Sequence, residues 1–134
     1  MRFLVLLFIL AMGCKSVDIG QATKMKVLKG NPNGTDYVNY EVSVTSDVDF
    51  TIEKLHFKGK DKPINFYYKD KATGKSSYDL LNPFPKGSYA LLFKVEGIEK
   101  FEVTDYIIIT YSVDGKTNLQ ELMVTPIVNP KMNR

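Results

Sequence analysis

The sequence predicts an all-β fold, a single two-layer β-sandwich with seven or eight strands in about 100 residues. From Thr23 onward, apolar and polar residues alternate at a period of two, and the eight tyrosines and many β-branched residues fit this pattern. The pairs Asn33-Gly34 and Asp114-Gly115 are typical of tight hairpin turns between such segments. No segment has a persuasive helical period, so we expect strands joined by turns.

The clearest strands are the second and the sixth along the chain. Residues 36–45 place Val38, Tyr40, Val42 and Val44 on one face, and residues 88–95 repeat this alternation. Residues 118–124 have some helical spacing, but their position after Asp114-Gly115 favours a returning strand. The expected strands cover 24–29, 36–45, 49–58, 63–69, 76–81, 88–95, 105–113 and 118–125.

The third expected strand contains a change of phase. Phe50 and Ile52 share one phase, whereas Leu55 and Phe57 share the other. A β-bulge near Glu53 would bring all four apolar side chains to the same face. We therefore expect this strand to bend in its middle.

The N-terminus has the layout of a secretory signal. Arg2 precedes ten apolar residues, Phe3 to Met12, and the small residue Gly13 follows. A helix of this length rises about 15 Å, half of the roughly 30 Å thickness of the hydrocarbon core, so it is too short to span a membrane. We expect residues 1–13 to be removed as a signal peptide.

Gly13 and Cys14, at the end of Leu10-Ala11-Met12-Gly13-Cys14, resemble a relaxed bacterial lipoprotein motif. The resemblance implies a thioether from Cys14 to diacylglycerol and an acyl chain such as palmitate on the new N-terminus. Ordinary secretory cleavage after Ala11-Met12-Gly13 is the alternative, and it would leave a free thiol. Lipidation also accounts for Cys14 being the only cysteine, which leaves no disulfide framework.

These boundaries give a simple domain organisation. Residues 14–23 are the expected lipidated cysteine and short tether, residues 24–126 the β-sandwich, and residues 127–134 a C-terminal tail. The composition, rich in Lys, Asn, Ile and Tyr, resembles lipoproteins of the Bacteroidota, which implies a lipid-anchored protein of the bacterial cell envelope at an outer membrane. The sequence is compatible with a domain on the periplasmic side of that membrane and with one on the outer side.

The segment from Pro85 to Val95 carries a second resemblance. A Pro-x-Gly turn leads into a strand that opens with Tyr89, as in bacterial immunoglobulin-like and transthyretin-like domains. The resemblance covers about eleven residues and implies only an immunoglobulin-like sandwich, with no function attached.

The sequence has no catalytic constellation, so we expect a protein that is not an enzyme and binds no metal or other cofactor. His56 is the only histidine, and we expect an ordinary surface position for it. The pair Asp47 and Asp49 suggests calcium, but a turn between strands explains it better. There is also no glycine-rich phosphate loop.

Lysine enrichment marks the region from Glu53 to Lys75, which contains seven lysines in a chain of net charge +3. The expected strand phases place a possible binding face on one side of the sheet, comprising Lys54, His56, Lys58, Tyr67 and Lys69 together with Asn65. Anionic lipid, an acidic glycan or an acidic protein could meet such a face. Alternatively, the lysines only protect a sheet edge from aggregation. Nucleic acid is not an expected partner, because arginine occurs only at Arg2 and Arg134.

Together these observations predict a lipid-anchored envelope protein that acts as a non-catalytic binding or assembly module. The membrane is one partner through the lipid, and an envelope protein or a glycan is the other. The alternative is a carbohydrate-binding or small-ligand-binding domain, or an accessory subunit of an envelope enzyme, with Tyr67, Tyr68 and Tyr78 as stacking platforms. The loop from Asn82 to Pro85 is a possible contact, although we expect Phe84 to belong to the core.

Overall fold

The computed structural model describes residues 17–28 and 36–128, and this part of the chain is all-β, as predicted. Besides the strands it contains a short 3₁₀ helix, η1 (Glu99–Phe101). The strands are β1 (Val17–Val27), β2 (Tyr37–Ser46), β3 (Thr51–Phe57), β4 (Tyr67–Asp70), β5 (Ser76–Ser77), β6 (Gly87–Glu96), β7 (Tyr106–Val113) and β8 (Lys116–Ile127).

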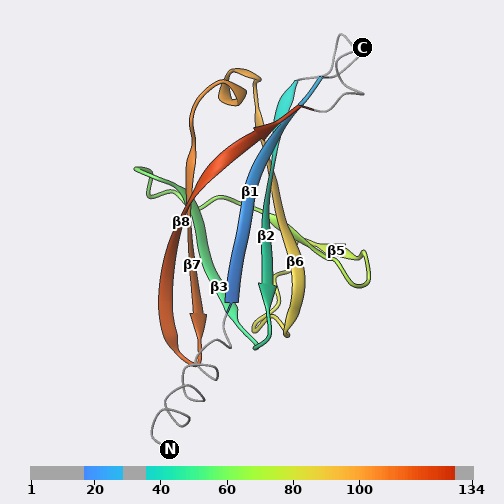
Figure 1. Ribbon diagram of the computed structural model, residues 1–134, viewed down its shortest axis with the longest axis vertical. Coiled ribbons are helices and arrows are strands. Elements are labelled where there is room, and N and C mark those ends of the chain that lie inside the picture. Colours follow the sequence, from blue (N-terminus) through green and yellow to red (C-terminus); the bar gives the residue numbers. More distant parts are fainter. Residues whose placement is uncertain (1–16, 29–35, 129–134) are drawn as a thin grey trace, which may run out of the picture.

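The strands form one sheet in the order β3-β7-β8-β1-β2-β6-β4-β5, which curls on itself (Figure 1). All neighbouring pairs are antiparallel except β1 and β8, which run parallel. Phe57 of β3 packs its ring against Tyr40 of β2 and Phe93 of β6, so the two halves of the sheet face each other across the core.

The strand order divides the sheet into two halves. One half runs β1-β2-β6-β4-β5 and the other runs β3-β7-β8. The parallel pair of β1 and β8 joins the halves, so the structure has a single continuous sheet where we expected two layers.

The first strand begins at Val17, which corrects the expected tether over residues 14–23. Val17, Ile19 and Ala22 are all buried, because a bulge between Ile19 and Ala22 shifts the register. The bulge breaks the period-two alternation, so this part of the strand had no recognisable pattern in the sequence. The first three residues of the proposed tether, 14–16, lie outside the described residues.

The bulge expected in the third strand is confirmed. The register between β3 and β7 shifts between Ile52 and Lys54, and both Ile52 and Leu55 are buried. The hairpin turn at Asp114-Gly115 is also confirmed, with φ angles of 51° and 77°. The other expected turn pair, Asn33-Gly34, lies outside the described residues.

The strands expected at 63–69 and 76–81 are much shorter than predicted. β4 begins only at Tyr67, and β5 comprises Ser76 and Ser77 alone. Residues 58–66 instead form an extended connection, in which the Ile64 amide donates to the Leu55 carbonyl at 2.7 Å. The apolar residues of this connection therefore cover the β3 edge without forming a strand.

Aromatic rings fill the core. Tyr40 and Phe93 stack with centroids 4.7 Å apart, and Phe50 and Phe84 stack at 5.3 Å. Phe84 is fully buried, which confirms its core role. Phe50 and Phe84 also exchange two backbone hydrogen bonds of 3.0 and 2.6 Å, which tie the start of β3 to the loop before β6.

The Pro-x-Gly turn is locked to the strand that follows it. The Tyr89 hydroxyl donates to the Pro85 carbonyl at 2.7 Å, four residues upstream. The Tyr89 ring also packs edge-on against Phe84 with centroids 5.1 Å apart. Tyr89 therefore holds the Pro-x-Gly turn that begins at Pro85, which is the turn that resembles those of immunoglobulin-like and transthyretin-like domains.

Candidate functional site

A groove of about 290 Å³ lies on the outer face of β2, β6 and β4. The strand register builds it, because Asn39 lies opposite Lys94 and Tyr67 lies opposite Leu92. These residues alternate with core residues, so their side chains lie on the outer face of the sheet. The groove is lined by Tyr37, Asn39, Asn65, Tyr67, Tyr78, Leu92, Phe93 and Lys94.

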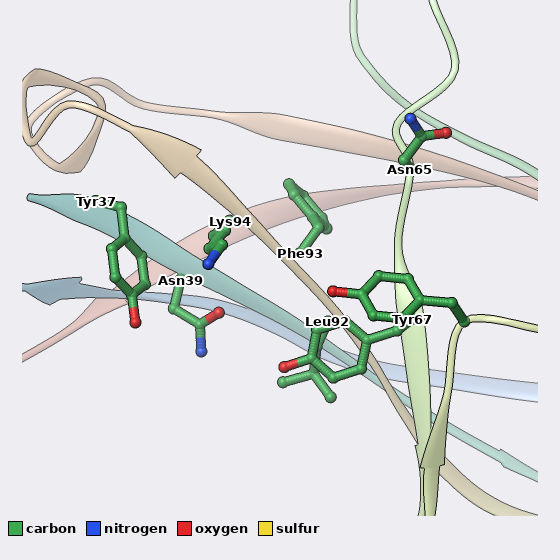
Figure 2. Close-up of a pocket in the computed structure, with 8 residues that line it drawn as sticks. Tyr37, Asn39, Asn65, Tyr67, Leu92, Phe93 and Lys94 are labelled. Atoms are coloured by element: carbon green, nitrogen blue, oxygen red, sulfur yellow. The ribbon is translucent and has the colours of Figure 1, made fainter. Parts of the chain in front are cut away.

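Tyrosine rings lie at both ends of the groove. At one end, the rings of Tyr67 and Tyr78 lie 5.1 Å apart between centroids and are tilted by 47°, and Tyr78 is 74% exposed. At the other end, the Lys94 ammonium lies 5.1 Å from the centroid of the Tyr37 ring. Figure 2 shows Asn39 and Lys94 between Tyr37 and Tyr67.

Among the described residues, the lining of this groove has one formally charged side chain, Lys94, and contains no Asp, Glu, His or Cys. It combines tyrosine rings with amide side chains and one cation, which can hold the apolar and polar parts of a ligand.

The structure separates the predicted binding face into two groups. Lys54, His56 and Lys58 belong to β3 and the residue after it, whereas Tyr67 and Lys69 belong to β4. β3 pairs with β7 and β4 pairs with β5 and β6, so the two groups do not share a ladder. The prediction of one common face was wrong, because the extended connection carries the chain from one half of the sheet to the other.

The β3 group lies against β7 and β8. Lys58 forms an ion pair with Glu121 at 3.1 Å, and its ammonium lies 5.3 Å from the Tyr106 ring centroid. His56 is half-buried, and its Nδ1 atom is buried with no hydrogen-bond partner among the described residues. The contacts of Lys58 with Tyr106 and Glu121 hold its side chain against β7 and β8.

The three tyrosines expected as stacking platforms do not all reach the surface. Tyr68 is only 8% exposed, and its ring packs against Phe84 with centroids 5.1 Å apart. Tyr67 and Tyr78 face outward and come together in the groove. The alternation along β4 explains this difference, since neighbouring residues of a strand point to opposite faces.

A buried polar cluster was not predicted from the sequence. The Lys24 ammonium lies 2.9 Å from the Asp105 carboxylate, and the Tyr40 hydroxyl donates to the same carboxylate oxygen at 2.6 Å. Lys24 also donates to the Val103 carbonyl. All three side chains of the cluster are at least 95% buried, with exposures of 1%, 5% and 0% for Lys24, Asp105 and Tyr40.

This cluster has a structural role. Burial raises the pKa of Tyr40, and its hydrogen bond to Asp105 and the charge of that carboxylate raise the pKa further. Tyr40 is therefore a neutral hydrogen-bond donor with no access to solvent. The position of Lys24 was a signal of this cluster in the sequence. Lys24 follows Ala22 by two residues, so both side chains lie on the buried face of the strand, and a lysine is buried on such a face only when its charge is paired.

Among the described residues, no group of three or more His, Cys, Asp or Glu side chains could hold a metal ion. No helix in that part of the chain has the length and apolar character to cross a membrane. The lipidation candidate Cys14 lies outside the described residues. Comparisons with protein-family models, with curated proteins and with solved structures found no match.

Proposed function

We propose that this protein is a non-catalytic binding module of the bacterial envelope, held to a membrane by lipid on Cys14, and that the groove binds a saccharide. The observation that carries the proposal is the pairing of Tyr67 and Tyr78 beside two amide side chains, Asn39 and Asn65. Tyrosine faces pack against the C–H face of a sugar ring, and amides donate and accept hydrogen bonds with its hydroxyls.

The sheet edges support this choice of surface. The β3 edge is covered by backbone hydrogen bonds at Phe50 and at Leu55. The opposite edge strand, β5, has only two residues. An added strand from a partner needs a longer row of open backbone groups than these edges offer. The outer face of β2, β6 and β4 is therefore the better contact surface.

The direction of β1 supports an anchored arrangement. β1 begins at Val17, which lies opposite Ser46, and ends at Val27, which lies opposite Tyr37. The groove residue Tyr37 is thus at the far end of the strand pair from the N-terminal side, roughly 30 Å away at about 3.3 Å per residue. A membrane anchor ahead of Val17 would place the Tyr37 end of the groove on the side of the domain away from the bilayer.

Replacing Tyr67 or Tyr78 with alanine should weaken saccharide binding by about tenfold, because tyrosine is enriched among the contact residues whose truncation costs most and a loss of about 1.4 kcal/mol is tenfold in affinity. The full-length protein, extracted in detergent, would be tested on an immobilised panel of neutral and acidic glycans. Tyr106→Ala is the matched control, because Tyr106 is also half-exposed but lies on β7.

Two results would contradict the saccharide proposal. The wild-type protein could retain no glycan of the panel, or the Tyr67→Ala and Tyr78→Ala variants could bind as tightly as Tyr106→Ala. Co-purification of a defined envelope protein, unaffected by Tyr67→Ala, would instead favour the assembly role.

Replacing Cys14 with alanine should release the protein from the membrane fraction and abolish its acyl mass. One acyl chain anchors a protein only marginally and two anchor it stably, so loss of the lipidation site removes the attachment. Intact-mass measurement of the wild-type protein should give a chain that begins at Cys14 and carries the added lipid. A soluble wild-type chain with an unmodified thiol would show ordinary secretory cleavage.

A further inference from the structure

A second hollow of about 340 Å³ adjoins the groove. The two share Asn65, Phe93 and Lys94 in their linings, and we call these two adjoining hollows the trough. We call the second hollow the basic end, since Lys60, Lys62 and Lys94 line it. Its other lining residues are Phe57, Pro63, Ile64, Asn65, Phe93 and Val95.

The charged side chains in the linings of the two hollows have one sign. Lys60, Lys62 and Lys94 are exposed, and neither hollow has Asp or Glu in its lining. Ammonium groups around one hollow repel one another, and a bound anion relieves that repulsion.

We propose that the ligand is an acidic saccharide, with a sugar ring against Tyr67 and Tyr78 and an anionic substituent at the basic end. This inference rests on the proposed saccharide function and adds the charge and the direction of the ligand. Lys94 lies in both hollows, so it is the residue that would contact both parts. The adjoining tyrosine groove favours a glycan over the headgroup of an anionic lipid.

The extended connection between β3 and β4 positions the anion-binding lysines. The Ile64 amide bonds to Leu55 and the Lys60 amide donates to the Phe57 carbonyl at 3.0 Å, which fixes both ends of the lysine-bearing segment. This segment has no regular secondary structure, but its backbone is attached to β3 at two points. The basic end is therefore a formed part of the surface.

The test compares each acidic glycan of an array with its carboxyl-reduced or desulfated counterpart, which keeps the sugar configuration and removes the charge. The full-length protein in detergent should bind an acidic glycan about tenfold more tightly than its neutral counterpart, and the difference should shrink as salt rises. Equal binding of the two counterparts would overturn the inference. Binding of anionic-lipid vesicles with no acidic glycan bound would overturn it as well.

Paired variants locate the anion. The double change Lys60→Ala with Lys62→Ala should reduce the preference for the acidic glycan to near parity. Lys75→Ala with Lys86→Ala removes the same charge from exposed positions outside both linings, and should leave the preference unchanged.

The variants also separate the two proposals. If Tyr67→Ala abolishes binding but the Lys60 and Lys62 changes act like the control pair, the saccharide function stands and the inference about charge fails. If the wild-type protein binds no glycan of the array, both fail. All four lysines are exposed, so loss of folding is not expected, and unfolding curves of the variants would verify it.

Discussion

Replacing Asp105 with alanine is expected to lower the free energy of unfolding by about 3–5 kcal/mol, the usual cost of breaking a buried ion pair. Asp105 accepts from the Lys24 ammonium at 2.9 Å and from the Tyr40 hydroxyl at 2.6 Å. Its removal leaves the Lys24 charge buried without its carboxylate, and it leaves the Tyr40 hydroxyl without this acceptor. Urea unfolding followed by circular dichroism would measure the loss.

Two control variants make this test specific. The triple change Lys24→Met with Tyr40→Phe and Asp105→Leu removes both charges and the hydroxyl that would lose its acceptor. It should cost much less than Asp105→Ala, because apolar residues of similar size often replace buried pairs without loss. Glu121→Ala breaks the exposed ion pair with Lys58 and should cost about 0–1 kcal/mol. A cost for Asp105→Ala no larger than that for Glu121→Ala would mean that the cluster does not stabilise the fold.

Replacing Phe84 with alanine should cost about 3–5 kcal/mol, since the change removes a fully buried ring and leaves a cavity. Phe84 stacks on Phe50, and Tyr68 and Tyr89 contact it edge-on at 5.1 Å between centroids. Residues of β4 and β6, together with Phe50 just ahead of β3, surround this ring, so neighbouring side chains cannot easily collapse into the space.

The natural comparison is Tyr78→Ala, which removes an aromatic ring that is 74% exposed. That change should alter the free energy of unfolding by roughly 0.5 kcal/mol or less. Equal costs for the two variants would show that the Phe84 side chain is not part of the core. Thermal and urea unfolding of the two proteins, measured together, would decide between these outcomes.

Strands in which apolar and polar residues alternate regularly could be predicted from the sequence. Strand segments in which this alternation is interrupted were harder to predict. Val38, Tyr40 and Val42 identify β2 because each is buried on one face. In β1 the bulge between Ile19 and Ala22 removes that regularity, so the sequence predicts a strand only from Lys24 and a tether before it. In β3 a similar bulge was recognised, because large apolar residues flank it on both sides.

The groove could be predicted only in part. Tyr67 and Tyr78 were expected as surface aromatics, and they do lie together. Tyr37 and Lys94 were not connected with them, because their proximity depends on the pairing of β2 with β6, whose residues are far apart in the sequence. The lysines were wrongly grouped, because the path of the chain after β3 cannot be read from charge alone.

The position of β1 has a mechanical consequence. β1 is not an edge strand, since it lies between β8 and β2 and is hydrogen-bonded to both. A pull on the chain ahead of Val17 acts along the strand axis and loads both ladders in shear, so many hydrogen bonds share the force. An edge strand pulled sideways would instead peel away one bond at a time. The domain is therefore built to withstand tension applied at its N-terminal end.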